Sequence, residues 1–168
     1  MLVTAWAQLT CAKRRGTSGH NSVKNRTVAY RQDFVNAARR HFRAATELHD
    51  VTAAGSQPGC RAVAGYLFGL SGELAVKAMM RDSGMVPLAS GSRRDDPYYA
   101  HFPELKDRLK DWASGRRDGE LRRVAESQAL FRNWDTQMRY APTADIEGAW
   151  IAAWRASAAD LIDRMDIP

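Results

Sequence analysis

A long apolar stretch between residues 62 and 84 dominates the pattern of hydrophobic and polar positions along the chain. Its sequence is AVAGYLFGLSGELAVKAMMRDSG. Six of its apolar residues recur at steps of three and four, which places them on one face of a helix: Val63, Tyr66, Leu67, Leu70, Leu74 and Ala78. The pattern predicts a central helix with this face in the core. Gly65, Gly69 and Gly72 lie along the same helix, and we expect a neighbouring helix to pack closely against them.

Weaker helical patterns lie on both sides of the central stretch. Before the central stretch they predict an amphipathic first helix from about Val28 to Leu48. After it they predict a short helix over 102–112, another over 121–134, and a terminal helix over 146–165 introduced by Pro142. The turn at 53–59 is short, so the first and central helices are expected to be antiparallel neighbours. No strand-like alternation bounded by turns is present. We therefore predict an all-α fold, an antiparallel bundle of about five helices over residues 28–166.

Composition and charge narrow the choices further. With 168 residues, 45% of them hydrophobic, the chain suits one domain with a substantial core. Residues 1–27 hold five Lys and Arg and no acidic residue, which accounts for most of the net charge of +6. We expect these residues to form a basic, disordered N-terminal tail. Because the remainder is nearly neutral, net charge alone does not argue that the bundle binds nucleic acid.

Several classes of protein are disfavoured by the sequence. Polar residues interrupt every apolar stretch before the length that a membrane span needs. Two cysteines supply no disulfide framework or cysteine-based metal site, so a reducing cytoplasm is expected. No Gly-rich phosphate loop, dinucleotide fingerprint, metal-ligand spacing or nucleophile elbow occurs, and we expect no cofactor.

Glu73 is the most unusual residue of the central helix, because a carboxylate is costly to bury without a partner. Lys77 lies four residues further on and is able to form an intrahelical ion pair with it. The second interpretation is that Glu73 orients a functional arginine from another helix. Both interpretations stay open at the level of sequence.

The order of the helices and four short phrases resemble the HEPN superfamily, small helical bundles of prokaryotic toxin–antitoxin and defence modules. The phrases are RHFRAATEL, GELAVKAM, HFPEL and NWDTQMRY, and the likeness covers residues 28–165. GELAVKAM is similar to the family's second-helix pattern of a Glu followed by Lys and Ala. NWDTQMRY is similar to the segment that leads into the family's last helix.

The resemblance implies a homodimer with a shared cleft and, in catalytic members, a metal-independent endoribonuclease. Those members carry an Arg followed a few residues later by a His, a pair suited to phosphate stabilisation and proton transfer. Arg139 and Tyr140 match the start of that motif, but positions 144–146 are Ala, Asp and Ile. The motif His is therefore missing here.

His101 is the candidate substitute for the missing His. It follows Arg94 with six residues between them, but the pair lies in a long loop that contains a proline. A structural role for His101, in which it and Phe102 anchor the HFPEL turn to the bundle, is the alternative. Glu73 and Tyr140 complete the candidate catalytic residues.

Arginines and tyrosines supply the candidate RNA-binding surface. Arg94, Arg132, Arg139 and Tyr140 are the residues proposed for phosphate binding and base stacking, with Tyr98 and Tyr99 as further stacking candidates. Four tryptophans fall at helical spacing with other apolar residues, which favours packing in the core or a dimer interface: Trp112, Trp134, Trp150 and Trp154.

Two hypotheses follow for function. The first is an RNA-binding or RNA-processing effector of a toxin–antitoxin or defence module, which predicts that the candidate residues converge on one groove. The second is a non-catalytic dimeric module that binds a partner protein such as an antitoxin. It predicts a buried Arg139 in a structural ion pair with Glu73 and a hydrophobic dimer face.

Overall fold

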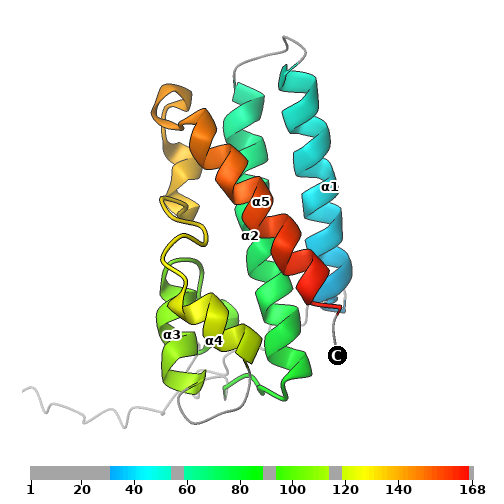
Figure 1. Cartoon of the computed structure of the whole chain (residues 1–168), viewed down its shortest axis with the longest axis vertical. Helices are drawn as coiled ribbons and strands as arrows, with labels where there is room; N and C mark the ends of the chain where they lie inside the picture. The colour runs from blue at the N-terminus through cyan, green and yellow to red at the C-terminus, as the bar shows by residue number, and fades with distance from the viewer. Residues whose placement is uncertain (1–30, 54–58, 89–93, 114–118, 167–168) are drawn as a thin grey trace, which may run out of the picture. The chain divides into compact units, whose positions relative to one another are not determined.

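The two longest helices form an antiparallel pair on which the rest of the fold is assembled (Figure 1). They are α1 (Phe34–Ala53) and α2 (Gly59–Asp82), and Ser71 Oγ donates a hydrogen bond of 2.8 Å to the Ala38 carbonyl between them. This computed structural model describes residues 31–53, 59–88, 94–113 and 119–166. The predicted tail, residues 1–27, and the turn centre at 54–58 lie outside that part of the chain.

The central helix α2 is buried on more of its circumference than the sequence pattern predicts. Val63 is 50% exposed and Tyr66 is only partly buried, although Ala78 is fully buried as expected. The deepest positions include Phe68 and Val76, each at 0% exposure, which lie outside the predicted stripe. A helix enclosed by neighbours on several sides buries apolar residues on all of them, so a single stripe describes it poorly.

The terminal helix α5 (Gly148–Arg164) runs obliquely across the α1–α2 pair and packs mainly on α2 (Figure 1). Two shorter helices, α3 (Glu104–Ala113) and α4 (Gly119–Glu126), pack against each other. The 3-10 turn η2 (Pro97–Tyr99) precedes α3. Lys106 of α3 donates hydrogen bonds of 2.9 Å to the Ser127 and Leu130 carbonyls. Partial burial of its ammonium group lowers the pKa of Lys106.

The predicted fourth helix is too long. It ends at Glu126 instead of Trp134, and Phe131 and Asn133 have φ of 50° and 63°, values that no right-handed helix contains. After this segment come two 3-10 turns, η3 (Thr136–Tyr140) and η4 (Thr143–Asp145). The helix ends early because the rings of Phe131 and Trp134 pack against Gly72 and Gly69 of α2. An irregular backbone places them there.

The three glycines of α2 are sites of close approach, as predicted: α5 reaches Gly65 and Gly72, while rings of the irregular segment come closest to Gly69 and Gly72. A Cβ atom on Gly65 would lie 2.9 Å from the Trp154 ring of α5. A Cβ on Gly69 would lie 1.9 Å from the Trp134 ring, and one on Gly72 would lie 2.3 Å from the Phe131 ring. Trp134 Nε1 also donates to the Gly65 carbonyl at 3.2 Å. The glycines thus fix where the irregular segment docks on α2.

The predicted fold class is confirmed: the described residues form five α-helices and no strand. These helices belong to one compact unit that begins at Gln32. Among the described residues, no helix has the length and apolar character needed to cross a membrane. Trp134 and Trp154 lie in the core, while Trp112 and Trp150 are partly buried against it.

Replacing Gly69 with alanine should destabilise the fold. The new methyl group would overlap the indole of Trp134, a rigid ring held by its own hydrogen bond, so we expect a loss of about 1–3 kcal/mol in the free energy of unfolding. Gly148→Ala is the matched control, because nothing lies within 4 Å of that position in the first turn of α5. Urea unfolding measures both. Equal stability of the two variants would contradict the docking role of Gly69.

Candidate active site

Glu73 and Lys77 form a buried ion pair in the middle of α2. Lys77 Nζ lies 2.6 Å from Glu73 Oε1, and the two side chains are 6% and 4% exposed. Residues four apart lie on the same helical face, so the spacing alone brings them together. The predicted intrahelical pair is therefore confirmed. Because one charge neutralises the other, neither is left uncompensated in the core.

The second partner of Glu73 is a histidine, not the arginine that the other interpretation expected. His101 Nδ1 lies 2.8 Å from Glu73 Oε2, although the two residues are 28 positions apart in the chain. The histidine side chain is 52% exposed and the carboxylate only 4%. Glu73 thus joins a buried ammonium to an imidazole that faces solvent.

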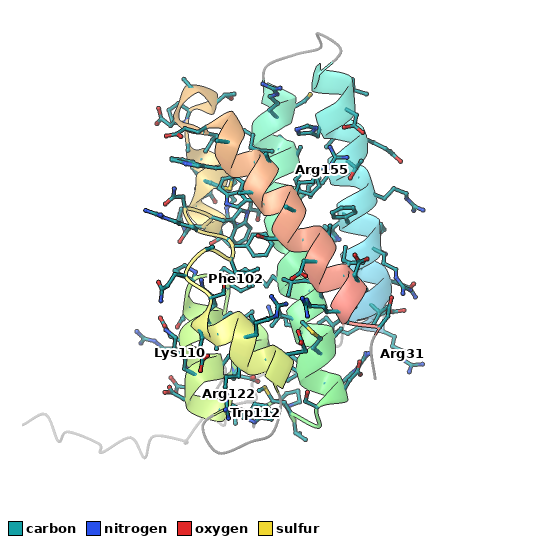
Figure 2. The ribbon with its side chains drawn as sticks, in the orientation of Figure 1. Arg31, Phe102, Lys110, Trp112, Arg122 and Arg155 are labelled. Carbon is teal, nitrogen blue, oxygen red and sulfur yellow. The ribbon has the colours of Figure 1, made fainter. Side chains whose placement is uncertain are left out.

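Phe102 fixes the backbone that carries His101. Its side chain is 1% exposed, lies beside α2 (Figure 2), and stacks on Phe131 with ring centroids 5.0 Å apart and planes at 20°. The His101 carbonyl accepts a hydrogen bond of 2.8 Å from the Leu105 amide at the start of α3. The expected anchoring of the HFPEL turn is therefore found. Anchoring by Phe102 leaves the imidazole of His101 at a defined place on the surface.

This arrangement determines what His101 can do chemically. A carboxylate without a proton only accepts hydrogen bonds, so the imidazole nitrogen next to it must carry the hydrogen. In the neutral ring the other nitrogen, Nε2, then has a lone pair and can accept a proton. A buried carboxylate that fixes the tautomer of a histidine is the arrangement found around the general-base histidine of Ser-His-Asp triads.

Arg139 and Tyr140 form a separate exposed cluster at the end of η3. The Arg139 guanidinium carbon lies 4.8 Å from the centroid of the Tyr140 ring, and Tyr140 is 73% exposed. Hydrogen bonding to Tyr66, and secondly to Tyr140, raises the pKa of Arg139. The arginine is exposed and its partners are tyrosines. The expectation of a buried Arg139 paired with Glu73 is therefore wrong, because Lys77 and His101 occupy the carboxylate.

Both clusters lie on one face of α2. Tyr66 and Glu73 are seven residues apart, which is close to two full turns and an axial separation of about 10 Å. Between them runs a continuous aromatic chain. Trp134 stacks on Tyr66 with centroids 5.9 Å apart and meets the edge of Phe102 at 6.3 Å. The rings hold the two clusters at a fixed spacing along the helix.

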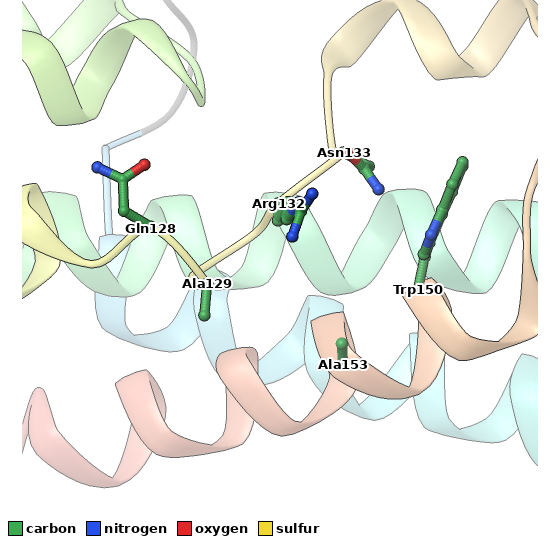
Figure 3. Close-up of a pocket in the computed structure, with 6 residues that line it drawn as sticks. All are labelled: Gln128, Ala129, Arg132, Asn133, Trp150 and Ala153. Atoms are coloured by element: carbon green, nitrogen blue, oxygen red, sulfur yellow. The ribbon is translucent and has the colours of Figure 1, made fainter.

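The other two candidates lie elsewhere. Arg132 lines an open surface pocket of about 590 Å³ between the irregular segment and α5, which Figure 3 shows. Around it stand the indole of Trp150, the amides of Gln128 and Asn133, and two alanines. Arg94 is exposed, and its carbonyl accepts a hydrogen bond of 2.8 Å from Arg108. The described contacts join Glu73 to His101 and Arg139 to Tyr140, but they do not join these pairs to Arg132 or Arg94. The expected convergence of all the candidate residues on one groove is therefore not found among the described residues.

Two residues of the site were missed as functional candidates. Tyr66 appeared only as part of an apolar stripe, and Lys77 only as an ion-pair partner. Tyr98, taken as a stacking candidate, packs against the core, and its hydroxyl donates to the Met85 carbonyl at 2.8 Å. A signal for Tyr66 did exist, because it precedes Glu73 by two helical turns on the same face.

Comparison with protein-family models, curated proteins and solved structures gives no match for this chain.

The buried ion pair predicts a specific double-mutant result. Glu73→Leu alone leaves the Lys77 ammonium buried without compensation, and we expect a loss of about 3–5 kcal/mol in the free energy of unfolding. Glu73→Leu combined with Lys77→Met removes both charges and should recover most of that loss. Chemical denaturation of the wild type, the Glu73→Leu variant and the double variant measures this recovery of stability.

Glu47→Leu provides the control, since this glutamate is exposed on α1. We expect a change within about 0.5 kcal/mol. A loss below about 1 kcal/mol for Glu73→Leu would mean that the ammonium reaches water, against the geometry described.

Proposed function

We propose that the protein is an HEPN-like RNA-processing effector, of the kind found in toxin–antitoxin and defence modules, in which His101 performs the proton transfer. The observation that carries the proposal is the hydrogen bond between the buried Glu73 carboxylate and the half-exposed His101 imidazole. The motif histidine of the resembled family is missing after Arg139, and His101 supplies an imidazole at another place on the bundle.

The reaction is cleavage of an RNA strand by its own 2′-hydroxyl. His101 Nε2 takes the hydroxyl proton while the oxygen attacks the adjacent phosphorus, and the bond from phosphorus to the 5′-oxygen breaks. The proton returns to the leaving 5′-oxygen, which gives a 2′,3′-cyclic phosphate and a 5′-hydroxyl end. The Glu73 carboxylate stabilises the imidazolium formed midway, as the acid of a catalytic triad does for its histidine.

Arg139 and Tyr140 supply binding in this proposal. A guanidinium that stays protonated attracts phosphate, and an exposed tyrosine ring offers a stacking surface for an unpaired base. Arg132 and Arg94 would contact phosphates at separate places on the surface. The homodimer and an antitoxin-type partner enter the proposal through the family resemblance alone.

The second candidate, a non-catalytic partner-binding module, carried two expectations, a buried Arg139 paired with Glu73 and a hydrophobic dimer face, and the first of them is not met. It required a buried Arg139 in an ion pair with Glu73, whereas Arg139 is exposed and Glu73 binds Lys77 and His101. No specific observation among the described residues favours it over the first candidate.

His101→Asn should strongly slow RNA cleavage while leaving the fold intact. The amide cannot accept a proton from a hydroxyl, so we expect a rate loss of about 10²–10⁴-fold. The assay is degradation of total cellular RNA by purified protein with a chelator present, followed by analysis of the new ends. His49→Asn is the control, because His49 contacts Asp50 and Arg155 and takes no part in the Glu73 cluster.

Full activity of His101→Asn would remove this histidine from the mechanism. A wild-type protein that neither cleaves nor binds RNA would reject the proposed function as a whole.

Arg139→Ala should weaken RNA binding in a salt-dependent manner. Loss of one phosphate contact on a single strand reduces the slope of log affinity against log salt by about 0.7. Tyr140→Ala should instead lower affinity by about 1–3 kcal/mol through lost stacking, with little change in that slope. Fluorescence anisotropy at several salt concentrations separates the two effects.

Arg43→Ala serves as the charge-matched control, since Arg43 is exposed on α1. Equal slopes for Arg139→Ala and Arg43→Ala would show that Arg139 contacts no phosphate.

A further inference from the structure

A second pocket, of about 280 Å³, opens at the end of α2 beside the start of α1 and the turn η2. Its walls include two aromatic residues of η2, one of α1 and two cations of α2: Tyr98, Tyr99, Phe34, Lys77 and Arg81. We propose that this pocket accepts one unstacked base of the RNA and so selects where the strand is cut. This inference rests on the proposed function and adds a specificity site to it.

The pocket is held open by contacts that do not depend on a ligand. Asp96, 1% exposed, accepts hydrogen bonds of 3.0 Å from the amides of Leu88 and Tyr98, which ties the chain after α2 to η2. The Tyr98 hydroxyl donates to the Met85 carbonyl at 2.8 Å, and burial raises its pKa to about 12. The phenol therefore keeps its proton at physiological pH and remains a hydrogen-bond donor. A preformed site loses little entropy when a base enters.

The size and chemistry of the walls suit a single base. The volume lies just below the range of about 300–1,000 Å³ typical of pockets for whole small molecules, so the pocket has room for one planar ring system. Phe34 stacks on Tyr98 with centroids 5.9 Å apart, and Tyr99 is 51% exposed. Aromatic faces with a nearby guanidinium and amide are the means by which proteins hold splayed RNA bases. Arg81 and Gln32 provide those two groups.

Two links place this pocket next to the catalytic pair. Lys77 lines the pocket and also donates to Glu73, whose other oxygen holds His101. Tyr99 precedes His101 by two residues, so their Cα atoms are at most about 7 Å apart. In this proposal, a base seated against Tyr99 brings its ribose and phosphate toward the His101 imidazole. The 2′-hydroxyl presented for attack would belong to that nucleotide or its neighbour.

The experiment measures binding apart from cleavage. Full-length protein carrying His101→Asn is titrated with fluorescent homopolymers of A, C, G and U, each about ten nucleotides long, which matches ordinary single-strand site sizes. The four 5′-mononucleotides are tested as competitors. We expect one homopolymer to bind most tightly, and Tyr99→Ala to weaken that one by about five- to hundred-fold, the effect of losing one base-stacking contact. Arg81→Gln should also weaken it.

Val86→Ala is the matched control, because Val86 is 77% exposed next to the pocket and does not line it. RNA binding that is indifferent to Tyr99→Ala and Arg81→Gln overturns the base pocket and leaves the proposed function standing. Tyr99-dependent binding of mononucleotides without any binding of RNA overturns the assignment to an RNA base. Absence of all RNA binding overturns both this inference and the proposed function.

Discussion

A carboxylate in the middle of a buried helix requires partners, and the way this protein satisfies Glu73 sets the geometry of its candidate site. Removing a charged group from water costs several kcal/mol unless close, well-directed contacts replace the lost hydration. Lys77 supplies one of these contacts from within α2, and His101 supplies the other from a distant segment. The hydrogen bond that the buried Glu73 carboxylate accepts thus fixes the tautomer and the position of the solvent-facing His101 imidazole.

Glycine and aromatic residues provide the complementary constraint. The rings of Trp134 and Phe131 fill the space above Gly69 and Gly72, and Phe102 stacks on Phe131 beside His101. These contacts bind the irregular segment after α4 and the turn before α3 to the same helix. As a result, the His101 cluster and the Arg139 cluster belong to one rigid face, about two helical turns apart.

Much of this fold could be predicted from sequence, because helical periodicity and the Glu73–Lys77 spacing are local properties. The contact between Glu73 and His101 could not, since it joins residues 28 positions apart through a loop without regular structure. The fourth helix was predicted too long for a related reason. The spacing from Leu121 to Trp134 fits a helix, but the last two aromatic residues are positioned by glycines on α2. The missing histidine after Arg139 and the candidate His101 were both visible in the sequence, whereas the contact of His101 with Glu73 was visible only in the tertiary structure.

The central claim is that Glu73 holds His101 in one tautomer, and ¹⁵N NMR of the imidazole tests it most directly. In the neutral ring the account predicts a proton on Nδ1 and a free lone pair on Nε2. It also predicts that this preference disappears when Glu73→Leu and Lys77→Met are combined, because the hydrogen-bond acceptor is then gone. A proton on Nε2 in the wild-type protein, or a tautomer that is unchanged in the double variant, would contradict the account.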